Sequence, residues 1–153
     1  MILLLLSEEA RMLPGQLALI SAAVFTGAAL YVNAVEQPAR LLLDNQALLD
    51  EWKPAYKRGT LMQAPNAILG FLLGVWAWWE TSNLLWIVGA LFMLANWPVT
   101  YIVIMPVNRK LMSTETPGPE SHSLIVKWAS LHAIRTSLGF AATVIFLWAS
   151  LYP

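Results

Sequence analysis

A histidine and an arginine lie one helical turn apart near the start of the last apolar segment. His132 and Arg135 share a helical face with Trp128 and Thr136. Imidazole exchanges a proton near neutral pH, so His132 is the candidate general base. Arginine keeps its proton, so Arg135 is the candidate for stabilising a developing oxyanion. The alternative is structural: Arg135 extends to the lipid headgroups and His132 hydrogen-bonds a carbonyl.

A second polar face is expected where the first apolar segment ends. Its members have the i, i+3, i+4 and i+7 spacing of one helical face and are Asn33, Glu36, Gln37 and Arg40. Glu36 is the candidate for orienting His132 or for balancing the charge of Arg135. Pro38 disfavours helical geometry at the residue before it, so a helix end with Gln37 and Arg40 in the headgroups is the alternative.

Amide and hydroxyl side chains continue the pattern in the second and third apolar segments. They are Gln63, Asn66, Asn96, Thr100 and Asn108. Such groups orient phenols and ketones through hydrogen bonds, so we predict that they bind substrate together with Asn33. Amides also hold membrane helices together, and packing alone is the competing explanation.

The elements that must position these side chains are apolar and long. The 153 residues are 58% hydrophobic and 12% charged, and charge-free stretches cover residues 12–35, 59–79, 81–108 and 136–153. About 20 apolar residues span a bilayer as a helix. We therefore predict an all-α fold, a single domain over residues 1–153 that forms a four-helix transmembrane bundle of up-down-up-down order, with helices near 13–36, 60–79, 84–106 and 129–151.

Composition excludes several classes of protein. The absence of cysteine excludes a disulfide-stabilised fold and thiol catalysis. The net charge of zero means that the chain lacks the excess positive charge typical of nucleic-acid-binding proteins. Basic residues, however, are distributed unevenly: eight fall in the first and third connections or beside them, and only Arg11 falls at the other end. By the positive-inside rule, both termini are expected on the non-cytoplasmic side.

The predicted topology brings the polar residues of the four helices to one end. Helices one and three end on the cytoplasmic side and helices two and four begin there, so the polar faces converge in that half of the bundle. Polar residues that only faced headgroups would appear at both ends. We therefore predict a shared polar pocket, with Trp52 and Tyr56 of the first connection as a lid that contacts the substrate.

Four segments resemble the anthrone-oxygenase-like family of integral membrane proteins. They are residues 27–40 (GAALYVNAVEQPAR), 52–59 (WKPAYKRG), 96–108 (NWPVTYIVIMPVN) and 128–135 (WASLHAIR). The resemblance extends from about residue 17 to residue 148 and implies a four-helix membrane fold. It implies a bacterial plasma membrane, since the chain is similar to bacterial-looking members.

The resemblance also implies a reaction. Fungal members oxidise anthrones to anthraquinones with molecular oxygen as co-substrate and without a cofactor, which suggests a monooxygenase acting on a small hydrophobic substrate. An anthrone has an acidic C–H beside a conjugated carbonyl. The expectation is that His132 removes this proton and that Arg135, with Asn96 or Asn108, stabilises the enolate oxygen.

Three readings of the residues stay open beside this one. The chain can be a non-catalytic membrane protein, such as a small-molecule binder or an assembly or transport component, because helix packing explains many of its amides. It can be a metal- or haem-dependent redox protein with His132 and Glu36 as ligands, although no metal site is predicted from the spacing. Small-residue faces also leave a homo-oligomer open.

Overall fold

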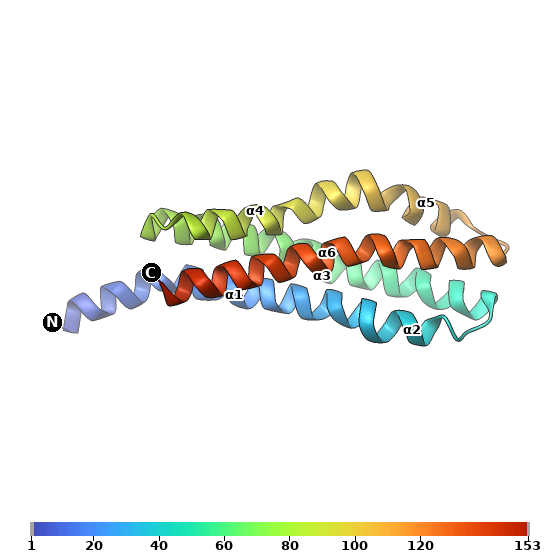
Figure 1. Cartoon of the computed structure of the whole chain (residues 1–153), viewed down its shortest axis with the longest axis horizontal. Coiled ribbons are helices and arrows are strands. Elements are labelled where there is room, and N and C mark those ends of the chain that lie inside the picture. The colour runs from blue at the N-terminus through green and yellow to red at the C-terminus, as the bar shows by residue number, and fades with distance from the viewer. Residues whose placement is uncertain (1, 153) are drawn as a thin grey trace.

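The computed structural model describes the backbone of residues 2–152 and the side chains of residues 11–152, and all regular structure in this part is helical. The first rod contains α1 (Ile2–Tyr31), a π-helix (Val32–Glu36) and α2 (Gln37–Arg40). The second rod is α3 (Asn45–Thr81). The third contains α4 (Leu84–Pro98), a second π-helix (Val99–Ile104) and α5 (Met105–Ser113), and the fourth is α6 (Pro119–Leu151) (Figure 1).

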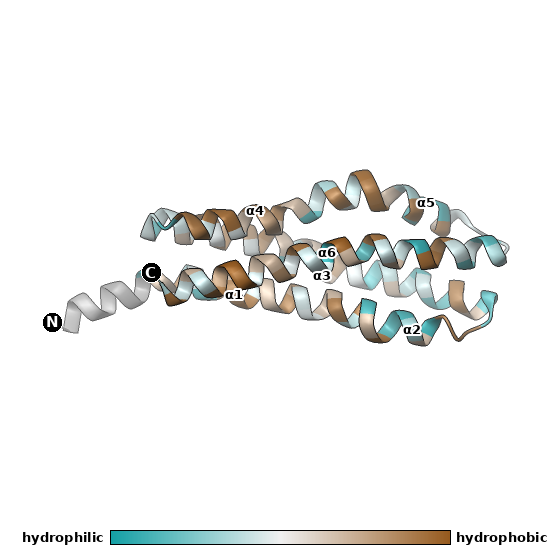
Figure 2. Cartoon of the chain, viewed as in Figure 1, coloured by the Kyte–Doolittle hydropathy of each residue, from teal (hydrophilic) through white to brown (hydrophobic). Residues whose placement is uncertain are grey.

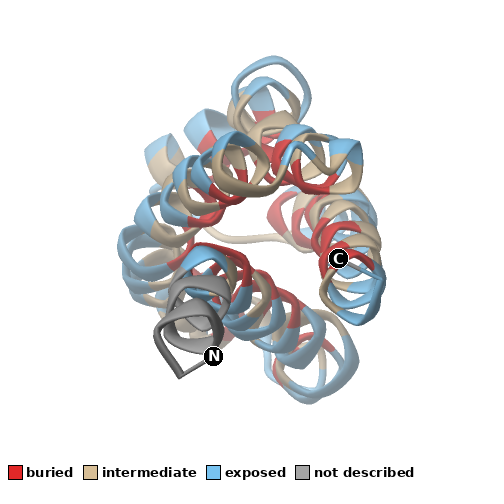
Figure 3. Ribbon diagram, turned by 90° about the vertical axis from the view of Figure 1, so that its left-hand side faces the viewer, coloured by how far each residue is buried: buried red, intermediate tan, exposed pale blue. Residues whose placement is uncertain are grey.

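All four rods are long and apolar enough to cross a membrane: Arg11–Arg40, Asn45–Thr81, Leu84–Ser113 and Pro119–Leu151. Buried residues face the centre of the bundle and exposed residues face outward (Figure 3). The outward face includes many large apolar side chains, such as Ile20, Leu72 and Phe140, which are more than half exposed. An apolar outer surface on helices of this length suits lipid, and the protein is a multi-pass membrane protein. The predicted all-α four-helix fold is confirmed.

Successive rods run in opposite directions in Figure 1, consistent with the predicted up-down-up-down order. The connections 41–44 and 114–118 lie at one end of the bundle, and the connection 82–83 lies at the other. We call the first the basic end, because it carries Arg40, Lys53, Lys57, Arg58, Arg109, Lys110 and Lys127. Hydrophilic residues gather towards this end (Figure 2).

The helices are longer at the basic end than the sequence predicted. The second rod was expected over 60–79, but α3 begins at Asn45, where the carboxylate of Asp44 accepts hydrogen bonds from the backbone N–H groups of Gln46 (2.9 Å) and Ala47 (3.0 Å). This cap satisfies free donors of the first turn. A helix of 37 residues is about 55 Å long, well beyond the roughly 30 Å of the hydrocarbon core. The first connection is therefore mostly helix, and it includes Trp52 and Tyr56.

Towards the 82–83 connection, the bundle core is built from small residues. Alanines of all four rods are fully buried there around Phe25, Trp86 and Phe146. A Cβ atom at Gly89 would lie 2.5 Å from Phe146 Cε1, so only glycine permits this approach. Close approach of backbones is how helices associate in lipid, and this half of the bundle is explained by packing.

Candidate functional site

A cavity of about 140 Å³ lies between the four rods, towards the basic end. Its lining includes eight of the eleven residues predicted for the site: Glu36, Tyr56, Gln63, Asn96, Thr100, Asn108, His132 and Arg135. These residues come from four segments far apart in the sequence, so only the packing of the rods brings them together. The convergence of polar groups towards one end is thus observed, while their roles stay predictions.

Both π-helices border the cavity. Val32 and Glu36 line it from the first, and Thr100, Tyr101 and Ile104 line it from the second. Each ends at an i to i−5 hydrogen bond, from the Gln37 N–H to the Val32 carbonyl and from the Met105 N–H to the Thr100 carbonyl. In each case the next residue is a proline, Pro38 or Pro106. One-turn π segments are frequent at functional sites, and the two prolines were the only sequence signal for these.

His132 is held by Asn33, which lies behind the cavity wall. The Asn33 amide nitrogen donates to the Ala129 carbonyl (2.9 Å), so the amide oxygen must face His132. This oxygen accepts from the Thr136 hydroxyl (2.8 Å) and lies 2.8 Å from His132 Nδ1. Because an amide oxygen only accepts hydrogen bonds, Nδ1 of a neutral His132 must carry the proton. The lone pair is then on Nε2, the nitrogen that a general base needs free.

The ring of His132 is also fixed by packing. It is only 3% exposed, and its centroid lies 4.9 Å from that of Trp128. The hydrogen bond and the aromatic contact hold the ring from two directions. A base held in one orientation and one tautomer needs little reorganisation before proton transfer.

Arg135 reaches the cavity without a counter-ion. Its guanidinium carbon lies 5.5 Å from the ring centre of Phe25, and its Nε is buried without a hydrogen-bond partner in the described part of the chain. No ion pair of Arg135 occurs among the described residues. A buried, unpartnered donor on a cationic group is suited to an oxyanion.

The predicted partnership of Glu36 with His132 or Arg135 is wrong. Glu36 forms an ion pair with Arg40, one turn further along the same rod, and Arg40 also pairs with Glu51 of α3 (Nε to Oε2, 3.0 Å). The Arg40 side chain is 3% exposed, so it does not extend into the headgroups. A buried cation requires close carboxylates, and Arg40 takes both of them. Asn33 has the orienting role that was expected of Glu36.

Arg40 and Glu51 were not among the predicted site residues, although Arg40 was expected on the same helical face as Glu36. Arg40 lines the cavity, and its guanidinium carbon lies 5.9 Å from the ring centre of Trp128. The i, i+4 spacing from Glu36 to Arg40 was the available signal. No signal pointed to Glu51, because its pairing depends on the tertiary contact between α3 and the first rod. Gln37, expected in the headgroups in one reading, is buried and donates to the Ile125 carbonyl (3.3 Å).

Three carboxamides present unsatisfied oxygens at the cavity. Gln63 Oε1, Asn96 Oδ1 and Asn108 Oδ1 are buried with no hydrogen-bond partner in the described chain. The Asn96 nitrogen donates to the Phe92 and Met93 carbonyls (3.2 Å each), so this side chain offers an acceptor and not a donor. Stabilising an enolate oxygen would require a donor, which Asn96 does not offer in this arrangement. Leaving buried acceptors unpaired is costly, and a ligand with hydroxyl groups would satisfy them.

Besides Asn33, two residues predicted to bind substrate lie outside the cavity lining. Asn66 joins two rods: its side chain accepts from the Ser21 hydroxyl (2.8 Å) and donates to the Ser21 carbonyl (3.0 Å). Trp52 is fully buried, stacks on Tyr56 (centroids 5.0 Å apart) and meets Trp128 edge-on (5.6 Å). Trp52 is thus no lid, because α3 directs it into a second core with Leu48, Leu49, Ile104 and Ile125.

Replacement of Trp52 by alanine should destabilise the protein. Removing a fully buried tryptophan leaves a cavity and lowers the free energy of unfolding by about 3–5 kcal/mol. Thermal unfolding of the protein in detergent micelles measures the loss. The matched control is Trp79→Ala, because Trp79 is 78% exposed. Equal melting temperatures for the two variants would contradict the buried position.

No group of three or more His, Cys, Asp or Glu side chains that could hold a metal ion occurs within residues 11–152. His132 and Glu36 both line the cavity, but His132 is hydrogen-bonded to Asn33 and Glu36 forms an ion pair with Arg40. The prediction of a base and a cation at one cavity does not depend on a metal.

Comparison with known proteins adds one finding. Residues 52–145 match the family described as anthrone oxygenase, a region that contains α4, α5, most of α3 and α6 and the cavity residues from Tyr56 onward. Neither a curated protein nor a solved structure matches. The match covers more than half of the chain and agrees with the resemblance of its motifs. The chain belongs to the anthrone oxygenase family.

Proposed function

We propose that this protein is a membrane monooxygenase that oxidises an anthrone or a similar acidic phenolic ketone with molecular oxygen. One observation carries the proposal: His132, in a tautomer set by Asn33, lines the same cavity as the unpaired guanidinium of Arg135. A fixed base beside an uncompensated cation is an arrangement for forming an enolate. Family membership supports the same reaction class.

The first step is removal of the acidic C–H proton by His132 Nε2. The electron pair of that bond spreads to the substrate's ketone oxygen, and Arg135 stabilises the resulting enolate. The enolate carbon passes one electron to oxygen, and the two radicals combine to form a C–O bond. The peroxide anion takes the proton back from His132.

The second step removes the remaining hydrogen from the same carbon. Loss of this proton with cleavage of the O–O bond forms the new carbonyl group and releases water. Anthrone and oxygen thus give anthraquinone and water, one molecule of each. The reaction is written with oxygen as the only co-substrate, because a stabilised carbanion reduces oxygen directly.

Substrate orientation follows from the remaining polar groups. Phenolic hydroxyls would donate to the free oxygens of Gln63, Asn96 and Asn108, and Trp97 Nε1, also buried without a partner in the described chain, would donate to a carbonyl. A site built to hydrogen-bond hydroxyl groups rejects analogues that lack them, since its acceptors then stay unpaired.

The test is oxygen consumption by the purified protein in liposomes. With anthrone we expect one oxygen consumed per anthraquinone formed, and one ¹⁸O atom in the quinone when ¹⁸O₂ is supplied. The substrate control is 10,10-dimethylanthrone, which has no acidic C–H at the reacting carbon. Activity should persist when a metal chelator is added. The active purified protein should show no visible absorbance from a bound cofactor such as haem. A rate equal to that of protein-free liposomes would overturn the proposal, and binding without oxygen uptake would indicate a non-catalytic binder.

The proposal includes an orientation in a bacterial plasma membrane, with the basic end in the cytoplasm. The chain has no cysteine, so single cysteines report topology without background. Thr116 is exposed at the basic end, and Tyr152 is 60% exposed near the C-terminus. In intact cells a membrane-impermeant maleimide should label Tyr152→Cys but label Thr116→Cys only after permeabilisation. The reverse pattern would contradict this orientation.

A further inference from the structure

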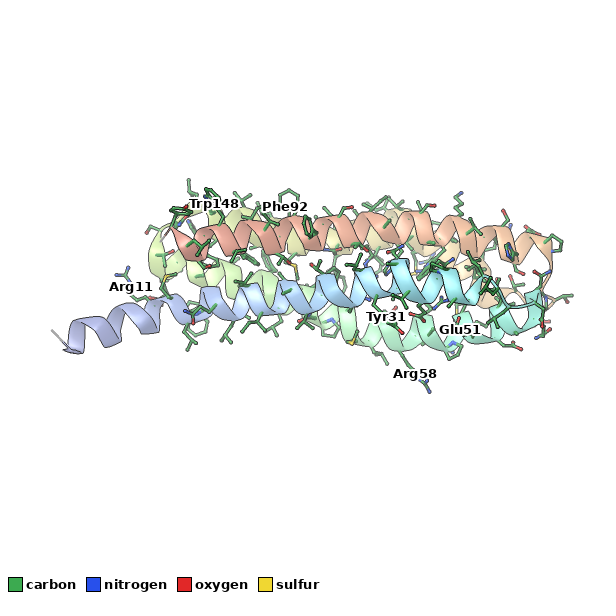
Figure 4. All side chains as sticks on the ribbon, turned by 60° about the horizontal axis from the view of Figure 1, so that its bottom comes forward. Arg11, Tyr31, Glu51, Arg58, Phe92 and Trp148 are labelled. Carbon is green, nitrogen blue, oxygen red and sulfur yellow. The ribbon has the colours of Figure 1, made fainter. Side chains whose placement is uncertain are left out.

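A groove of about 510 Å³ lies on the flank of the bundle between the first rod and α3. Tyr31 of α1 and Met62 of α3 line it and are 57% and 54% exposed, so the groove is open to the surroundings. Figure 4 views this flank, with Tyr31, Glu51 and Arg58 labelled and Arg58 projecting outward from α3. Its walls are apolar at Ala28, Val32, Pro54, Ala55 and Met62.

The groove adjoins the cavity that is lined by His132. Five residues line both: Val32, Glu36, Ala55, Gly59 and Gln63. They belong to two facing elements, the first π-helix and the middle of α3. The cavity and the groove therefore adjoin between these two elements, and Gly59 lies at this boundary on the α3 side.

The size of the cavity makes the groove necessary for a larger ligand. A cavity of about 150 Å³ accommodates benzene, whereas drug-sized ligands occupy about 300–1,000 Å³. The cavity, at about 140 Å³, has room for about one six-membered ring. The groove is more than three times larger.

We propose that the groove is the second compartment of the substrate site and its entrance from the lipid, with Gly59 as the residue that sets how large a substrate can enter. One end of a flat polycyclic phenolic ketone lies in the cavity beside His132, and the remaining rings lie in the groove against Val32 and Met62. This inference rests on the proposed function for its substrate class. It adds a second binding region, an entry route and a size-determining residue.

Gly59 allows a direct test. A Cβ atom added to Gly59 would meet no atom within 4 Å, so this position has open space for the first atom of a side chain. A larger side chain at Gly59 would extend into the region where the cavity and the groove adjoin. Gly27 is the matched control: it also lies inside a helix, its added Cβ also meets nothing within 4 Å, and it lines neither the cavity nor the groove.

The experiment compares Gly59→Leu with Gly27→Leu in liposomes, using a one-ring and a three-ring probe. Binding of phenol and of anthraquinone is followed by quenching of tryptophan fluorescence, since Trp97 and Trp128 line the cavity. Gly59→Leu should weaken anthraquinone binding about tenfold or more and change phenol binding less than about twofold. Gly27→Leu should match the wild type with both probes. Gly59→Ala should give an intermediate effect, which keeps the test valid if the leucine variant does not fold.

Each other outcome counts against one proposal only. Wild-type anthraquinone affinity in Gly59→Leu, or an equal loss of phenol binding, would overturn the groove as a second compartment. Failure of the wild type to bind anthraquinone would overturn it as well. If the wild type binds both probes as expected but consumes no oxygen with anthrone, the proposed reaction fails and the two-compartment site stands.

Discussion

Replacement of His132 by alanine is expected to abolish anthrone-dependent oxygen uptake. A positioned general base contributes about 10²–10⁴-fold to a rate, and within residues 11–152 no other histidine lines the cavity. The rate of oxygen consumption in liposomes, corrected for anthrone autoxidation, measures the effect. Amounts of protein in the membrane should be unchanged.

The control for this variant is the second histidine of the chain. His122 lies near the start of α6 and does not line the cavity, so His122→Ala should retain wild-type turnover. His132→Gln preserves a polar side chain that can hydrogen-bond Asn33 and lacks the basic nitrogen, which separates loss of the base from loss of packing. Turnover at the wild-type rate in His132→Ala or His132→Gln would remove His132 from the mechanism.

Replacement of Asn33 by leucine is expected to lower kcat/KM by about 10²-fold, although Asn33 does not line the cavity. The amide oxygen is the group that keeps the proton of His132 on Nδ1 and leaves Nε2 free. Without it, His132 populates both tautomers, and its ring loses one of its two restraints. Asn33 is thus a positioning residue.

A measurement on the imidazole itself separates positioning from general damage. In protein with ¹⁵N-labelled histidine and His122→Ala, nitrogen NMR should show the Nδ1–H form of His132 in the wild type and a mixture in Asn33→Leu. The control is Thr136→Val, which removes the other hydrogen bond to the same oxygen and leaves the contact with His132 intact. An unchanged tautomer in Asn33→Leu would contradict the role of Asn33.

Much of the site was predictable because membrane topology orders it. Once four apolar segments alternate in direction, every polar residue near the ends of helices one and three and the starts of helices two and four must lie in the same half of the bundle. Asn108 and His132 are 24 positions apart in the sequence, yet they line one cavity for this reason. Charge placement and hydrophobic length are properties of single segments and can be recognised without contacts.

The pairing of side chains within that half was not predictable. The spacing of Glu36 suits Arg40, but Arg135 and His132 were equally eligible partners until packing buried Arg40 between Glu36 and Glu51. Trp52 was assigned to a lid because it was expected in the first connection, at the mouth of the pocket. The continuation of α3 to Asn45 instead directs it into a core with Trp128. Both errors have one origin: the ends of apolar segments are not the ends of helices.

The sequence by itself determined that this is a four-helix membrane protein of the anthrone oxygenase family, with its polar groups at one end. The reason is that segment length, hydropathy and motifs can each be recognised within a single segment, without knowledge of tertiary contacts. Only the tertiary structure decided which nitrogen of His132 is free, which oxygens stay unpaired, and that a groove shares Gly59 and four other lining residues with the cavity. These features depend on distances between rods. They also depend on two π-helices that shift the register of side chains after Tyr31 and Pro98.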